Sequence, residues 1–428
     1  MKYIQEIHES NLFGVVIETG CSAAIASTLM NVAGSSKTIY RTEQPYNKEY
    51  QENLYGKFDR SVSREWIRTV LELEYKKAPE KVNFILASSW QLLDPTNSLV
   101  YAHGWIGLFD IKRNVKHYLH FSFNRTLFKG YKALTDEKFA DEYNQHKIGY
   151  DSADRNFALQ MIGQIACSIL HTAINGDIKQ LNYAHSNDII LDNAYINDDI
   201  NYDLLISNLE KVDGDYFLVF DKGNVIRIED LMRKSNEFVI QKGSFNPLHH
   251  GHIRQITGTH EKYPNALPAF LISTFRYDKP HINYEELKER IDMFAKAGYP
   301  LIICKSVLFY ETFSLLQKWS YEKQFYFTMG YDTLNRIYKT DFDFVTEKIQ
   351  KNGYGHPDFT VNLKTFIDIK IKQYKDNIKF LLFDRKDFTR LEETHLYDEM
   401  VEYIHVAVDD GISSSKIRNG ELENKIKL

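Results

Sequence analysis

The sequence is poor in cysteine and proline. Its three cysteines, Cys21, Cys167 and Cys304, are odd in number and far apart, which excludes a disulfide framework and a thiolate zinc site. Nine prolines stand beside 28 tyrosines and 27 phenylalanines, a balance that argues against disorder. The scarcity of cysteine favours a reducing compartment, and we expect a cytoplasmic protein.

The sequence also lacks an excess of positive charge and a long apolar run. Its formal net charge is -5, which argues against a general binder of nucleic acid or membrane surfaces. The first ten residues lack the apolar region of a signal peptide. The most apolar helical run, residues 161–174, is too short and too interrupted to span a bilayer. We therefore expect neither nucleic acid nor membrane as a partner, and any phosphate site must be local.

Apolar periodicity predicts an α/β protein of two domains. In residues 1–180, apolar runs predict strands that alternate with helices. Residues 181–235 are rich in Asn and Asp and predict a connector, with a hairpin around Asp-Lys-Gly-Asn. In residues 236–428, strand patterns again alternate with helix patterns, which predicts a Rossmann-like, doubly wound parallel sheet.

A histidine-rich motif follows the first strand of the second domain, in the sequence GSFNPLHHGH. Gly243 and Pro247 force a turn at the carboxyl end of that strand, where open α/β sheets bind ligands. The helix that follows offers free N–H groups to an anion, and Gly251 allows a phosphate to come close. His249 and His252 can share one helical face and donate to one phosphate.

Two other interpretations of this motif are weaker. Given the chain's own composition, chance would place these residue types at these spacings about once in a million, which argues against a mere histidine-rich surface loop. A metal site would need a further carboxylate or thiolate beside the two histidines. We predict His249 and His252 as the catalytic residues, and Gly243, Ser244, Phe245 and Gly251 as binders of nucleotide or phosphate.

A second motif, ISSSKIR, lies near the C-terminus. Ser413, Ser414 and Ser415 open a predicted helix that carries Lys416 and Arg418. Hydroxyl groups and N–H groups at a helix start, with a cation one turn later, suit a polyphosphate. An ordinary serine N-cap would have the same sequence pattern. This motif therefore indicates a polyphosphate site only in combination with the histidine motif.

Two further stretches can contribute to a ligand site. Gly330 and Asp332 follow the strand of residues 324–330, and Asp332 can accept ribose hydroxyls or simply cap the next helix. Lys279 follows another strand and can meet the phosphate of an acceptor, or lie in a solvated loop.

Both motifs resemble the nucleotidyltransferase superfamily with the HxGH signature, over residues 236–425. ISSSKIR is similar to the ISSTxIR signature of the nicotinamide/nicotinate mononucleotide adenylyltransferases, while the Gly-Ile-Ser at 411–413 leaves a cytidylyltransferase open. The resemblance implies that His249 and His252 bind the α- and β-phosphates of the donor. It also implies that Ser414, Ser415 and Arg418 hold the β/γ end, with Mg²⁺ bridging the phosphates.

The first domain resembles the C-terminal domain of CinA-type proteins, the nicotinamide mononucleotide amidohydrolases. Glu18, the Gly-Ser-Ser at 34–36 and Tyr46 stand at matching spacings. The family's serine is replaced by Thr19, its lysine by Gln51, and its paired glycines by the Ser-Ala at 22–23. We therefore expect a kept fold, a vestigial pocket at Thr19 and Tyr46, and no amide hydrolysis. Homo-oligomers are also implied, because this family often assembles through that domain.

The leading hypothesis is an Mg²⁺-dependent enzyme that transfers AMP from ATP to nicotinamide or nicotinate mononucleotide. One alternative is a transferase that uses CTP or another phosphorylated acceptor. Another is a nucleotide-binding regulator without catalysis, which the intact His249, His252 and Arg418 disfavour.

Overall fold

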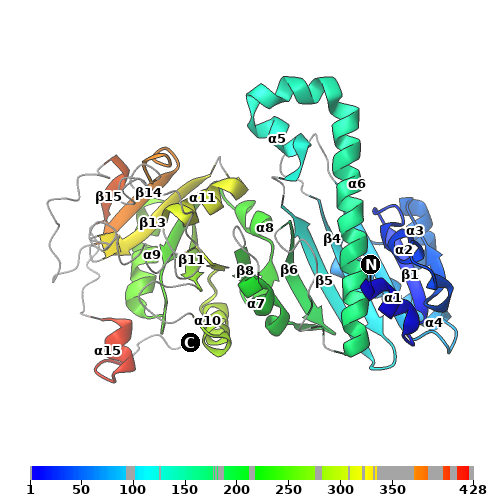
Figure 1. The fold of residues 1–428 in the computed structure, drawn as a ribbon. Coiled ribbons are helices and arrows are strands. Elements are labelled where there is room, and N and C mark those ends of the chain that lie inside the picture. The colour runs from blue at the N-terminus through cyan, green and yellow to red at the C-terminus, as the bar shows by residue number, and fades with distance from the viewer. Residues whose placement is uncertain are drawn as a thin grey trace. The chain divides into compact units, whose positions relative to one another are not determined.

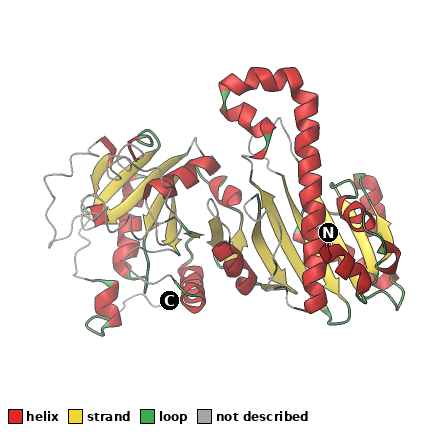
Figure 2. Cartoon of the chain, viewed as in Figure 1, coloured by secondary structure: helices red, strands yellow, loops and turns green. Residues whose placement is uncertain are grey.

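The computed structural model has two compact units, Met1–Asp213 and Gly214–Leu428, each with its own sheet (Figure 1). Helices and strands are distinguished by colour in Figure 2. The structure describes residues 2–92, 102–124, 127–176, 178, 181, 188–211, 217–274, 282–306, 309–320, 323–330, 333–334, 371–383, 399–404 and 412–423.

Unit 1 is built on a seven-stranded sheet in the order β2-β1-β3-β4-β5-β6-β7. β1 pairs in parallel with both β2 and β3, and the pairings from β3–β4 to β6–β7 are antiparallel. The strands are β1 (Gly14–Thr19), β2 (Ile39–Glu43), β3 (Phe84–Gln91), β4 (His103–Asp110), β5 (Val115–Phe123), β6 (Ile189–Ile196) and β7 (Asp199–Ile200). The helices are α1 (Lys2–Glu9), α2 (Ala24–Met30), η1 (Ser35–Lys37), α3 (Lys48–Tyr55), α4 (Arg64–Lys77), α5 (Lys129–Thr135), α6 (Glu137–Asn175) and α7 (Tyr202–Lys211).

Helices cover both faces of this sheet. On one face, Trp66, Ile67 and Leu71 of α4 pack against Ile85 and other buried strand residues. On the other face lies α6, which packs on α2 (Figure 1). A Cβ at Gly163 of α6 would come within 2.0 Å of Thr28 Oγ1, so only glycine lets these two helices approach so closely.

By length and hydropathy, α6 could cross a membrane, but 56% of its most apolar 18-residue segment is buried inside the unit. The central helix of a globular domain gives the same signal. Its helical geometry is interrupted once, at His146 (φ -116°, ψ 17°).

Unit 2 confirms the predicted Rossmann-like architecture. Its sheet has the order β15-β14-β13-β10-β11-β12-β8-β9, so the parallel strands from β12 to β15 follow the order 3-2-1-4-5-6. The strands are β8 (Phe217–Asp221), β9 (Asn224–Ile226), β10 (Glu237–Lys242), β11 (Leu267–Ser273), β12 (Leu301–Cys304), β13 (Gln324–Gly330), β14 (Ile378–Phe383) and β15 (Val401–Ile404). The helices are α8 (Ile228–Met232), α9 (His250–Lys262), α10 (Tyr284–Ala297), α11 (Phe309–Ser320) and α15 (Ser414–Arg418).

The structure divides residues 181–235 differently from the predicted connector. Residues 189–211 form β6, β7 and α7 of unit 1, and β6 is buried along most of its length. The predicted hairpin is β8–β9, which joins the sheet of unit 2 by antiparallel pairing of β8 with β12. The Asn- and Asp-rich composition was misleading because two of these polar residues, Asp192 and Asn193, are buried in β6.

The loop between β1 and α2 keeps a backbone that suits glycine. Gly20 has φ +77°, and a Cβ there would lie 1.9 Å from the carbonyl oxygen of Trp90. Ser22 (φ 49°) and Ala23 (φ 60°) are also left-handed, at the two positions where the resembled family has glycines. Two residues with side chains therefore adopt a backbone conformation that favours glycine, which strains this loop.

We predict that Ala23→Gly stabilises unit 1 by about 1 kcal/mol, because glycine adopts the left-handed conformation without steric cost. Thermal denaturation should show a melting temperature raised by about 2–4 °C. The matched control is Ala26→Gly in α2, which should lower the melting temperature because glycine weakens a helix interior. A fall in both variants would contradict the strain in this loop.

Candidate phosphate-binding site

The turn after β10 is fixed by a buried phenylalanine. Phe245 is 2% exposed, has φ 41°, and packs edge-on against Phe270 and Phe294 at centroid distances of 5.2 and 5.3 Å. A Cβ at Gly243 would lie 2.9 Å from the Phe245 ring. The role of Gly243 in the structure is therefore to make room for the ring that anchors the turn.

A buried arginine holds the same turn from α10. Arg290 is 3% exposed, and its Nε donates to the carbonyl oxygen of Ser244 at 2.9 Å. Its guanidinium also contacts Glu286 on the same helix. Ser244 thus contributes its backbone to the shape of the turn, and Arg290 is a positioning residue that the sequence analysis missed.

The two histidines of the motif stack on each other. His249 directly precedes α9 and is 6% exposed, and His252 lies in its first turn. Their ring centroids are 3.7 Å apart, with 22° between the planes. The Nδ1 of His252 accepts from the backbone N–H of His249 at 3.2 Å, so in neutral His252 the proton sits on Nε2. The predicted pair therefore shares one face, with His252 in the tautomer that can donate through Nε2.

The serine motif docks onto this turn. Ser414 Oγ donates to the carbonyl oxygen of Pro247 at 3.0 Å, and Arg418 Nη1 donates to the carbonyl oxygen of Asn246. Ser413 caps α15 by accepting from the N–H of Lys416. The two motifs, about 165 residues apart in the sequence, are thus adjacent in the fold.

Side chains at this junction leave little spare room. Arg418 Nη2 also donates to Ser415 Oγ at 3.2 Å. A Cβ at Gly251 would meet Ile412 Cγ2 at 3.0 Å and the His249 ring at 3.1 Å. Gly251 therefore also permits the contact between the histidine motif and the serine motif.

The site lies at the topological switch point of the sheet. β10 is flanked by β11 and β13. After β10 the chain forms β11 and β12 on one side of it, and then β13, β14 and β15 on the other side. Gly330 ends β13 at the same carboxyl edge, which is where open α/β sheets bind ligands. The other predicted residues of this edge, Asp332 and Lys279, lie outside the described residues.

A lysine that the sequence analysis did not single out stands beside the site. Lys242 ends β10, and its Nζ donates to Thr312 Oγ1 at 2.7 Å and to the carbonyl oxygen of Ser306 at 3.2 Å. Burial lowers the pKa of its ammonium group, although nearby Cys304 and Glu311 act to raise it. The signal in the sequence was a charged residue at the carboxyl end of a strand, directly before the glycine of the histidine motif.

In unit 1, Thr19 and Tyr46 are the two residues predicted to form a vestigial pocket. Thr19 Oγ1 donates to the carbonyl oxygen of Pro45 at 3.2 Å, and the Tyr46 side chain is 70% exposed. Cys21 is fully buried, and burial together with the nearby Glu18 carboxylate raises its pKa well above the usual value. A thiol with a raised pKa is a poor nucleophile.

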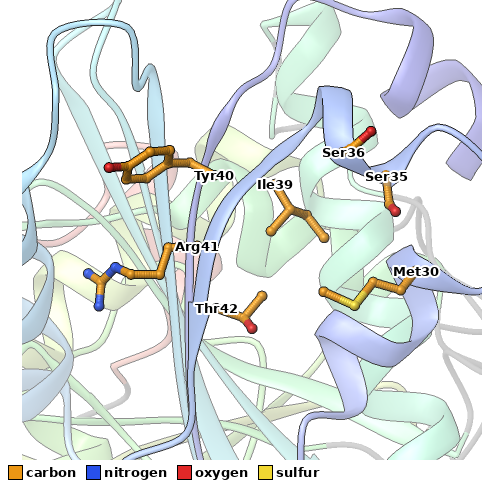
Figure 3. A pocket seen from close by; sticks show the side chains of 7 residues that line it. All are labelled: Met30, Ser35, Ser36, Ile39, Tyr40, Arg41 and Thr42. Carbon is orange, nitrogen blue, oxygen red and sulfur yellow. The ribbon is translucent and has the colours of Figure 1, made fainter.

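Glu18 has a structural role in the same unit. Its carboxylate accepts from the N–H groups of Ile25 and Ala26 at 2.7 and 3.0 Å, at the start of α2. The Ser35 and Ser36 hydroxyls lie elsewhere, at a pocket of about 300 Å³ beside β2 (Figure 3). Other lining residues are Met30 and residues 39–42. This pocket is therefore separate from Thr19 and Tyr46.

Among the described residues, no group of three His, Cys, Asp or Glu side chains is placed to hold a metal ion. Magnesium prefers oxygen ligands and is commonly carried by the phosphates of a nucleotide.

One protein-family model and several solved structures match parts of the chain. The model of the cytidylyltransferase-like family matches residues 240–420. No curated protein matches the chain in sequence. Among solved structures, the competence/damage inducible protein CihA from Agrobacterium tumefaciens is 15% identical, with a TM-score of 0.27, and the match covers 41% of this chain and 92% of that one.

A second solved structure is the nicotinic acid mononucleotide adenylyltransferase of Plasmodium falciparum, complexed with NaAD. It is 17% identical, with a TM-score of 0.28, and the match covers 43% of this chain and 82% of that one. Similarities of this size carry no conclusion about activity. The family match rests instead on the segment that contains both motifs: residues 240–420 are similar to the cytidylyltransferase-like family, which supports a nucleotidyltransferase.

Proposed function

We propose that unit 2 transfers AMP from ATP to nicotinamide or nicotinate mononucleotide. A phosphate oxygen of the acceptor attacks the α-phosphorus of ATP, and the bond to the β-phosphate breaks, so that pyrophosphate leaves. No protein nucleophile takes part, and catalysis consists of positioning and charge stabilisation. Mg²⁺ bound to the phosphates would supply further charge neutralisation.

The observation that carries the proposal is the docking of the serine motif on the histidine motif. Ser414 and Arg418 contact the carbonyls of the turn that leads into the stacked pair His249 and His252. Donors from both motifs therefore converge on one place at the carboxyl edge of the sheet. A triphosphate is long enough to contact both, with the histidines at its α- and β-phosphates and Arg418 and Ser415 at its far end.

The acceptor assignment rests on the sequence ISSSKIR and its resemblance to ISSTxIR. A transferase that uses CTP is the second candidate, because the matching family model is described as cytidylyltransferase-like. A panel of ATP and CTP against nicotinamide mononucleotide, nicotinate mononucleotide and choline phosphate, with pyrophosphate release as the measurement, separates the two. If no combination of nucleotide and acceptor releases pyrophosphate, the result would favour a nucleotide-binding regulator without catalysis.

We predict that His252→Ala lowers kcat by about 10²–10³, because it removes a donor to charge that develops in the transition state. The variant should keep its melting temperature, since the His252 side chain is not fully buried. The matched control is His260→Ala, an exposed histidine in the same helix, which should leave kcat unchanged. A correctly folded His252→Ala protein with activity within a few-fold of wild type would refute the assignment.

We predict that Arg418→Ala raises the KM for ATP by about tenfold or more, because a charge-assisted hydrogen bond to a terminal phosphate is lost. The effect on kcat should be smaller, since the proposal places Arg418 at the far end of the triphosphate and not at the α-phosphate that reacts. Lys416→Ala, on the same short helix, is the control and should change KM less. An unchanged ATP KM in the arginine variant would exclude this role.

Unit 1 in this proposal has lost amide hydrolysis. We predict that the full-length protein releases no ammonia from nicotinamide mononucleotide, because Gln51 is neutral, Tyr46 is exposed and Cys21 is buried with a raised pKa. Ammonia release that disappears in Cys21→Ala would instead identify a working thiol hydrolase.

A further inference from the structure

The connection between α3 and α4 of unit 1 borders a cavity that belongs to neither motif of the sequence. Its volume is about 420 Å³, which lies in the range of small-molecule sites in proteins. It extends from Tyr55, the last residue of α3, along the first turns of α4 as far as Thr69. Neither Thr19 nor Tyr46 lines it, and it shares no residue with the pocket beside β2. The cavity is therefore a separate feature of unit 1.

Aromatic side chains form one wall of this cavity. Trp66 and Tyr55 are 2% and 4% exposed, and Phe58 is half-buried. The rings of Tyr55 and Phe58 both meet the Trp66 ring edge to face, at centroid distances of 5.9 and 6.4 Å. Because each ring is held by another, the wall keeps its shape without a ligand. Such a wall suits a flat apolar ring, which gains both buried area and ring-to-ring attraction.

The indole N–H of Trp66 lacks a hydrogen-bond partner. Its Nε1 atom is buried, and no group in the described part of the chain accepts from it. A buried tryptophan usually satisfies this donor, because an unpaired buried N–H group is costly. The protein supplies no acceptor, and Trp66 lines the cavity. An acceptor atom of a ligand in the cavity is therefore the partner that this N–H group lacks.

The start of α4 adds further donors to the cavity. Ser63, which lines it, caps the helix by accepting from the backbone N–H of Trp66 at 3.1 Å. The backbone N–H groups of Arg64 and Glu65 also belong to the first turn, where N–H groups have no partner inside the helix. The dipole of this 14-residue helix places a partial positive charge at the same end. This end of the cavity therefore favours an anionic group.

The charged side chains that line the cavity decide how large that anionic charge can be. Lys57 and Arg60 supply two positive charges, and Asp59 and Glu65 supply two negative charges. All four residues are exposed, and their charges cancel. What remains is the helix dipole, which is equivalent to about half a positive charge. A carboxylate, with one negative charge, matches this remainder better than a phosphate dianion does.

We propose that this cavity is a second small-molecule site and that it binds a small aromatic carboxylate. The carboxylate lies at the start of α4, where it accepts from backbone N–H groups and from Nε1 of Trp66. Lys57 and Arg60 attract it from the rim of the cavity, and its ring packs against Tyr55 and Phe58. The proposal is independent of the function proposed for unit 2, because every residue that it uses belongs to unit 1.

The test titrates the full-length protein with benzoate and follows binding by saturation-transfer NMR. Benzamide has the same shape without the charge, and it should bind at least about tenfold more weakly because charge-assisted hydrogen bonds are lost. Cyclohexanecarboxylate keeps the charge without the aromatic ring, and it should bind about threefold or more weakly. Phenyl phosphate carries a second negative charge, and tighter binding of this compound than of benzoate would overturn the assignment to a carboxylate.

One variant tests the unpaired donor. Trp66→Phe keeps an aromatic ring and removes the N–H group, and it should weaken benzoate binding by about tenfold, as expected for a hydrogen bond to a charged group. Lys76→Ala is the control for nonspecific effects, because Lys76 is exposed at the opposite end of α4. It should leave the dissociation constant unchanged. An unchanged constant in folded Trp66→Phe would overturn the role of the indole.

If Trp66→Phe does not fold, a variant of exposed residues decides the question. The double substitution Lys57→Glu and Arg60→Glu reverses both positive charges at the rim, and it should weaken benzoate binding by about tenfold or more while the melting temperature is kept. The matched control is Lys76→Glu, which should have no effect. The proposal is wrong if wild type binds benzoate no better than benzamide, or if the double variant binds benzoate as wild type does.

Discussion

The site of unit 2 depends on the position of one buried strand. β10 is parallel to both of its neighbours and has four buried residues in succession, so its register is fixed from both sides. Its carboxyl end delivers Lys242, then the turn anchored by Phe245, and then the first turn of α9. The burial of β10 therefore sets where the candidate site begins, and the contacts of Phe245, Arg290 and the serine motif then fix the turn that follows.

The sequence predicted those parts of the structure that local patterns specify. The strand, turn and helix around His249 and His252 were predictable because glycine, proline and apolar runs have direct conformational consequences. The contact of Ser414 and Arg418 with this turn was predictable only through the family resemblance, since no local rule joins residues so distant in the chain. Arg290 was missed because a helical arginine usually points to solvent, and only the fold shows that it is buried.

A line of hydrogen-bonded side chains in unit 1, formed by His103, His120 and Asp192, was not predictable from the sequence for a different reason. His103 and His120 are 17 residues apart, and Asp192 follows 72 residues later, so no fixed spacing connects them. They meet because β4, β5 and β6 are antiparallel neighbours, and a register shift beside His120 brings Asp192 into line. The inward Asp and Asn residues of β6 broke the apolar alternation, and the same strand was therefore interpreted as part of a connector.

The docking of Ser414 and Arg418 on the carbonyls of Pro247 and Asn246 has a consequence for how the enzyme matures. These hydrogen bonds join residues that are 167 and 172 positions apart, so on the ribosome the histidine motif emerges long before its partner. The strands around β10 can pair first, whereas the proposed site is completed only when the serine motif, about 165 residues further along the chain, has been synthesised. Under the proposed function, proteolytic removal of the serine motif would take away the residues that are expected to hold the terminal phosphate of the nucleotide.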